Sequence, residues 1–157
     1  MKLNVLLGFT AAYMALPGAQ FQVPTLSYAG ISLNSDFQAV AARYPHSRPE
    51  REYISLAPED VHDHISAVEI SGTGSTRRVR IAFETPGARG HPEYPSCATI
   101  EAQVSHQFGR PQAVRRFMEE ASPRADRVWH SRTESLTLIC FSEKGHLWAE
   151  AVQITPR

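Results

Sequence analysis

Two histidines separated by a single residue, His62 and His64, are the side chains whose types and spacing point most directly to chemistry. On a β-strand, residues two apart project to one face, where two imidazoles can bind a divalent metal ion. The preceding residues 58–60 (Pro-Glu-Asp), however, are typical of a helix start, and in a helix such residues do not face each other. A specific metal site also needs three or four ligands, and no third ligand has a convincing spacing. We therefore expect a solvated loop with titrating histidines, and neither a resident metal nor another cofactor.

Motifs that activate a nucleophile are absent from the sequence, including Gly-x-Ser-x-Gly, Ser-x-x-Lys and His-Glu-x-x-His. The glycine-rich residues 72–76 lack the lysine of a phosphate loop, and a hairpin turn between two strands explains them better. We therefore expect a protein that is not an enzyme. A small metal-dependent hydrolase around His62 and His64 is kept as a hypothesis that ranks third, after the two binding functions given at the end of this subsection.

Cys97 and Cys140 are the two cysteines of the chain. In an exported protein an even number of cysteines indicates a disulfide, which stabilises by about 4 kcal/mol in the chain-entropy model. Two buried free thiols, as in a cytosolic protein, are the alternative. We expect the disulfide because the amino terminus favours export.

Residues 1–19 have the layout of a secretory signal peptide, with Lys2 followed by an apolar stretch and a small-residue exit. The apolar part is too short to span a bilayer stably. We therefore expect a periplasmic or secreted protein whose mature chain, residues 20–157, forms one domain. The whole chain has 16 basic and 16 acidic residues, so losing Lys2 leaves a net charge of −1. This near-neutral balance predicts neither nucleic acid nor anionic lipid as a partner.

The first half of the mature chain indicates a short helix followed by strands. Ser35 and Gln38 form a capping box ahead of an apolar helical stripe that Pro45 ends. Strands are expected at residues 53–57, 65–71 and 76–84, of which the last alternates apolar and polar side chains.

The pattern begins again after a linker of residues 85–96, which is rich in proline and glycine. Thr99 is expected to cap a helix that ends at Gly109. Residues 112–125 are ambiguous, because Val114, Phe117 and Met118 suit one helical turn on the core while Ser122-Pro123 marks a loop. Further strands are expected at residues 127–131, 135–141 and 147–155.

The halves, residues 30–84 and 97–157, therefore match in pattern, which predicts a tandem αβββ repeat. A single domain with one six-stranded sheet is the alternative. Both give an α+β fold, mostly antiparallel sheet with two short helices.

Both helical segments resemble an element of bacterial envelope proteins, in which a polar cap and a short helix exit through Gly-x-Pro into a β-meander. The residues that carry the resemblance are Gly30-Ile31, Val40 and Tyr44-Pro45, then Thr99-Ile100, Val104 and Phe108-Gly109-Arg110-Pro111. The element is seen in the small lipoprotein of the outer-membrane assembly machine and, duplicated, in the beta-lactamase inhibitory protein. The first segment lacks the exit glycine, and no lipobox cysteine follows the leader. The resemblance implies a sheet whose open face binds another protein, and no functional residue carries over.

Trp129, Arg78 and Arg80 are the expected partner-binding residues, because tryptophan and arginine dominate interface energetics. Trp148 shares a strand face with Val152 and is expected in the core, so Trp129 is the surface candidate. The sequence thus predicts an exported module that binds a protein partner in the periplasm or outside the cell, as an inhibitor or immunity protein. An envelope-assembly or solute-binding accessory protein is the alternative.

Overall fold

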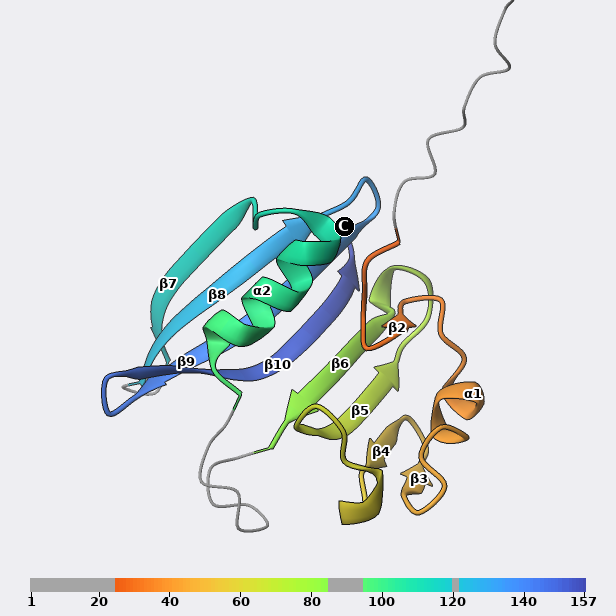
Figure 1. The fold of residues 1–157 in the computed structure, drawn as a ribbon. Helices are drawn as coiled ribbons and strands as arrows, with labels where there is room; N and C mark the ends of the chain where they lie inside the picture. The colour runs from red at the N-terminus through yellow and green to blue at the C-terminus, as the bar shows by residue number, and fades with distance from the viewer. Residues whose placement is uncertain (1–24, 85–94, 120–121) are drawn as a thin grey trace, which may run out of the picture.

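An eight-stranded antiparallel sheet dominates the protein (Figure 1), with the strand order β3-β4-β5-β6-β10-β9-β8-β7. The computed structural model describes residues 25–84, 95–119 and 122–157. The strands of this sheet are β3 (Arg48–Glu50), β4 (Tyr53–Ser55), β5 (Ile65–Ser71), β6 (Arg78–Phe83), β7 (Ala113–Glu119), β8 (Ser122–His130), β9 (Glu134–Glu143) and β10 (His146–Pro156). The predicted α+β class with mostly antiparallel sheet is confirmed.

One face of the sheet is covered by the other elements. These are a small hairpin of β1 (Ser27–Tyr28) and β2 (Ile31–Ser32), the helices α1 (Phe37–Ala41) and α2 (Cys97–Phe108), and the 3-10 turns η1 (Pro58–Asp60) and η2 (Gly74–Thr76). Figure 1 shows α2 lying across β8, β9 and β10. Ile31 of β2, Val40 of α1 and Ile100 of α2 belong to the same buried apolar core as the sheet residues Val79 and Ile81. The core therefore lies between the sheet and one layer of covering segments.

A disulfide joins the first turn of α2 to β9. Cys97 and Cys140 are both fully buried, with an S–S distance of 2.01 Å. This confirms the predicted pairing, and a disulfide is consistent with a location outside the cytoplasm.

The β5–β6 hairpin matches its sequence pattern most closely. β5 has the predicted bounds, and Val79, Ile81 and Phe83 are buried at alternate positions of β6. Gly72 begins the connection with a φ of +70°, and a Cβ atom there would overlap the carbonyl oxygen of Thr76. Glycine is therefore required at this turn.

Both helix starts differ from their prediction by a few residues. Asp36 caps α1, since its Oδ1 accepts a hydrogen bond from the Ala39 N–H at 2.9 Å, whereas the Ser35 hydroxyl accepts from the Ser32 N–H. Ser96 caps α2 by accepting from the N–H of Thr99, which lies inside the helix. In each case a second polar residue close to the predicted cap is the one that reaches the free amide groups.

Two strands were not predicted, and they give the sheet eight strands instead of six. β3 contains Pro49, which is tolerated because β3 is an edge strand. Residues 113–119 form the strand β7, so the helical turn is wrong, and Val114, Phe117 and Met118 are exposed rather than in the core. The loop expected at Ser122-Pro123 is also wrong, since these residues begin β8. Pairing with β8 overrides the local helical spacing.

Each half of the chain contains a helix followed by a four-stranded meander. The two meanders meet where β6 pairs with β10. The predicted leader, residues 1–19, and most of the predicted linker lie outside the described residues. Among the described helices, none is long and apolar enough to cross a membrane.

Candidate functional site

The sheet face opposite the helices, which we name the open face, is not covered by any described element. Side chains alternate along a strand, and those that pair across strands share a face. The register therefore places the following residues on the open face: Tyr53, Ala67, Glu69, Arg78, Arg80, Ala82, Arg115, Phe117, Glu119, Arg124, Asp126, Val128, Thr137, Ile139, Phe141, Ala151 and Gln153. Glu150, at a bulge in β10, is held on the same face by its arginine contacts.

Small and apolar side chains form the centre of the open face. Ala67, Ala82, Ala151 and Ile139 lie opposite one another on four neighbouring strands. Ala151 is fully buried and Ile139 is 8% exposed, although neither belongs to the core on the helix side. Longer side chains in the adjacent rows therefore screen this centre from solvent.

Six charged side chains form two neighbouring sets of ion pairs on the open face, which together we name the charge ladder. Its members are Glu69, Arg78, Arg80, Glu150, Arg124 and Glu119. Arg78 and Arg80 each place Nη2 at 2.6 Å from a carboxylate oxygen, of Glu69 and Glu150 respectively. Arg124 contacts both Glu150, at 3.4 Å, and Glu119. The ladder is neutral overall and presents donors and acceptors in alternation.

Two carboxylates of the open face have opposite electrostatic surroundings. Burial raises the pKa of Glu69, but hydrogen bonds from Arg78 and Ser71 outweigh it, so the pKa is lowered. Burial dominates at Asp126 and raises its pKa, against the opposing effects of Arg124 and the Cys140 backbone amide. The open face therefore holds one carboxylate that is stabilised in its charged form and one that is destabilised.

Asp126 and Arg124 also carry buried polar atoms without a described partner. Asp126 is 9% exposed, and its Oδ1 accepts no hydrogen bond from any residue that the structure describes. The Nε of Arg124 likewise makes no hydrogen bond within the described ranges. Such groups cost free energy unless a water molecule or another group satisfies them, so they single out Arg124 and Asp126 on the open face.

The two tryptophans are placed opposite to their prediction. Trp129 is fully buried, and its indole N–H donates to the carbonyl oxygen of Gly109 at 2.8 Å. It pairs with Leu136 on the helix side, which excludes it as a surface anchor. Trp148 is only half-buried and lies beside His146, with ring centroids 5.5 Å apart. Arg78 and Arg80 lie on the open face, where the alternation of β6 puts them.

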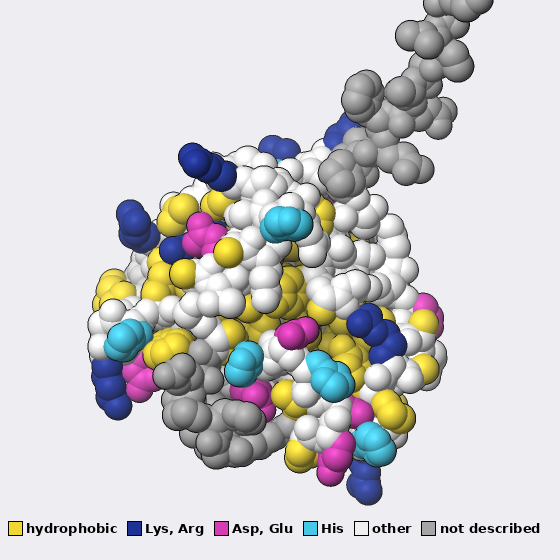
Figure 2. All heavy atoms as spheres, viewed as in Figure 1, with side chains coloured by type: hydrophobic (Ala, Val, Ile, Leu, Met, Phe, Trp, Pro, Cys, Tyr) yellow, Lys and Arg dark blue, Asp and Glu magenta, His cyan; other side chains and the backbone are white. Residues whose placement is uncertain are grey.

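His62 and His64 are exposed in the turn after η1. Asp63 and His64 have φ values of +52° and +63°, so the segment is neither a strand nor a helix and the two imidazoles do not share a face. The Nδ1 atom of His64 lies 3.8 Å from Glu84 Oε2. The described residues contain no group of three or more metal-binding side chains, and the histidines on the helix side are spread over the surface (Figure 2).

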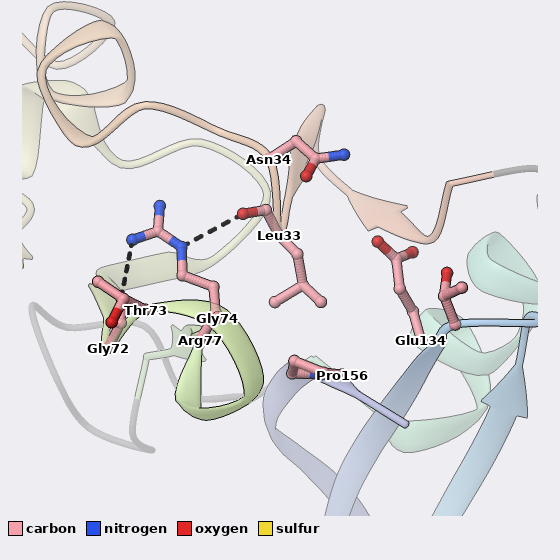
Figure 3. A pocket seen from close by; sticks show the side chains of 9 residues that line it. Leu33, Asn34, Gly72, Thr73, Gly74, Arg77, Glu134 and Pro156 are labelled. Carbon is pink, nitrogen blue, oxygen red and sulfur yellow. Dashed lines mark hydrogen bonds between the residues drawn. The ribbon is translucent and has the colours of Figure 1, made fainter.

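A hollow of about 470 Å³ lies where the β1–β2 segment meets the end of the sheet (Figure 3). Arg77 on one side donates to the carbonyl oxygens of Leu33, Gly72 and Ser35. Glu134 on the other side is buried and accepts from the Leu26 N–H at 2.8 Å. Both charged groups thus hold the amino-terminal segment against the sheet. The charged side chains that line this hollow therefore have a structural role, and we do not take the hollow as the functional site.

The site residues that the sequence did not single out are Glu69, Glu119, Arg124, Asp126 and Glu150. The signal in β8 is weak because that strand carries an arginine on each face: Arg127 points to the helix side and pairs with Glu101 at 2.8 Å. The alternation of apolar and charged residues that identified Arg78 and Arg80 in β6 is therefore not visible in the sequence of β8. Comparison of the chain with known protein families, with curated proteins and with solved structures gave no significant match.

Proposed function

We propose that this protein is a non-enzymatic module that binds another protein through its open face, outside the cytoplasm, as an inhibitor or immunity protein. The observation that carries the proposal is an eight-stranded sheet with its covering elements on one face and a charge ladder on the other.

The composition of the open face supports this role. Arginine and aromatic side chains are enriched at protein interfaces, and the open face combines the arginines of the ladder with Tyr53, Phe117 and Phe141. Alternating charges favour one partner over others because like charges that meet across an interface are costly. A partner with the reverse order of charges fits the ladder.

The buried atoms of Arg124 and Asp126 add a specific recognition point. A partner that supplies an acceptor to Arg124 Nε and a donor to Asp126 Oδ1 would satisfy both groups. Asp126 accepts such a donor in its charged form, and the raised pKa also allows it to donate when protonated.

Export and internal duplication complete the proposal. The disulfide supports an oxidising compartment, and we retain residues 1–19 as the predicted leader. The helix-plus-meander pattern of each half supports a tandem repeat, with an αββββ unit in place of the expected αβββ unit. Duplication of a meander joined edge to edge produces one wide face suited to binding a protein surface.

Partner capture with charge-reversed variants tests the proposal. The tagged protein is incubated with the envelope and secreted fractions of its own source, and Arg80→Glu is compared with Arg132→Glu, which changes an exposed residue in the β8–β9 turn. We expect one protein to be retained at 1:1 by the wild type and by Arg132→Glu. Arg80→Glu should weaken its binding by at least about tenfold, the scale of an interface hot spot.

Circular dichroism of both variants checks that each is folded. A partner retained equally by Arg80→Glu and Arg132→Glu would place binding on another surface. Turnover of a hydrolase substrate that is lost on His64→Ala would instead support the third hypothesis.

A further inference from the structure

β7 is the longer of the two strands that end the eight-stranded sheet. β7 pairs with β8 on one side and ends the sheet on the other. Six of its seven residues are exposed, and Val114, Phe117 and Met118 are 48%, 43% and 64% exposed. An exposed, apolar edge strand of this length is a template for pairing with another strand.

We propose that a second copy of this chain pairs antiparallel with β7, edge to edge, so that two molecules form one continuous sheet. This inference goes beyond the proposed function, because it concerns a different partner, and it shares only Arg115, Phe117 and Glu119 with the open face already described. It rests on the order of residues in β7, which is complementary to itself.

Among the registers centred on residues 115 to 117, the charges of β7 favour one. If the symmetry axis passes through Phe117, Arg115 of each copy lies opposite Glu119 of the other, and the two Phe117 rings meet at the centre. Opposite charges and aromatic pairs directly across strands are stabilising. If the axis passes through Arg115 or Arg116, two arginines lie directly opposite each other, which is destabilising.

The face on which these residues lie agrees with the register. Arg115, Phe117 and Glu119 all project to the open face of β7. A two-fold axis perpendicular to the sheet keeps the open faces of both copies on one side, so each Arg115 can reach the opposing Glu119. Arg115 makes no ion pair with any residue that the structure describes, whereas Arg124 already holds Glu119 at this edge.

Charge reversal at the two positions tests the register. Arg115→Glu leaves two glutamates on each edge and Glu119→Arg leaves two arginines, so each variant repels its own kind. The two variants complement each other, because every Arg–Glu pair is restored when one molecule of each kind associates. Light scattering on the full chain should therefore report a dimer for the wild type, monomers for each variant alone, and a dimer for their equimolar mixture.

Arg132→Glu and Glu59→Arg are matched controls at exposed positions away from β7 and should remain dimeric. A wild type that stays monomeric at high concentration would overturn the proposal and leave the edge to a strand of a different protein. A dimer that persists in both single variants would overturn the register. Partner capture through Arg80 can succeed or fail independently of the dimer, so the two proposals are distinguishable.

Discussion

The two faces of the sheet are built by different interactions from the same strands. The helix side is held by apolar packing, in which Trp129, Leu136 and Ile154 lie opposite one another on adjacent strands and are fully buried. The open face has a narrow apolar centre and a neutral ladder of ion pairs. Exposed ion pairs contribute little to stability, whereas buried apolar side chains contribute much.

The difference between the two faces indicates that one face serves mainly folding and the other mainly binding. Residues of the helix side are committed to the core, so changes there should act mainly on the free energy of unfolding. The charge ladder of the open face carries little of that task, so changes to its exposed members should act mainly on association. Four measurements test this separation.

Trp129→Ala should have the largest effect on stability. It removes a fully buried indole and its hydrogen bond to Gly109, so the free energy of unfolding should fall by about 3–5 kcal/mol in denaturant titrations. Trp148→Ala, the same change at a half-buried position, is the control and should cost clearly less. Equal losses would show that the two tryptophans do not differ as the structure indicates.

Loss of the disulfide should come next. Replacing Cys97 and Cys140 together by alanine should lower the free energy of unfolding by about 4 kcal/mol, because the unfolded chain loses its cross-link. The measurement compares the variant with the oxidised wild type, and the reduced wild type serves as control. An unchanged midpoint after reduction would contradict the contribution of this link between α2 and β9.

The two carboxylates of the open face should give pH dependences of opposite sign. The raised pKa of Asp126 means that the folded protein keeps this proton to a higher pH than the unfolded chain, so its contribution to stability falls as pH rises through that pKa. The lowered pKa of Glu69 gives a contribution that is present above the unfolded pKa and is lost as pH falls through the folded one.

Denaturant titrations over a pH series measure these signs. Asp126→Asn should remove the fall in stability with rising pH and should not destabilise at neutral pH. Glu69→Gln should lower stability at neutral pH by less than about 1 kcal/mol and have no effect in acid. Glu59→Gln, at an exposed position in η1, is the control. Parallel pH profiles for Asp126→Asn and wild type would contradict the raised pKa.

Arg78→Ala should have the smallest effect on stability. Arg78 is exposed at the end of the charge ladder, so the free energy of unfolding should change by less than about 0.5 kcal/mol. A loss as large as that of a core substitution would show that the ladder holds the sheet together and that the two faces are not separated.

The parts that sequence predicted are those with one strong local pattern. β5, β6 and the disulfide follow from alternation and from two cysteines in a chain with a leader-like start. β7 did not, because Val114, Phe117 and Met118 have helical spacing and only the pairing with β8 makes them a strand. Trp129 was predicted on the surface and is buried. The face on which it lies is set by its cross-strand neighbour Leu136, which the local sequence does not reveal.

The site was only half predictable for the same reason. Arg78 and Arg80 lie in a strand with clean alternation, while Arg124 and Glu150 join the ladder through strands that are distant in sequence. Their proximity is a property of the strand order, in which β6 and β8 are separated by β10 and β9. No local pattern contains that information.

The junction of β6 with β10 has a consequence for motion. This pairing runs from Val79 to Ala82, whereas β10 pairs with β9 along its whole length. Short ladders open at lower free energy than long ones, so amide hydrogens at this seam should exchange with solvent before those of the long β9–β10 ladder. The two halves of the sheet would then move relative to each other about this seam. Such movement changes the curvature of the open face and lets it fit a partner.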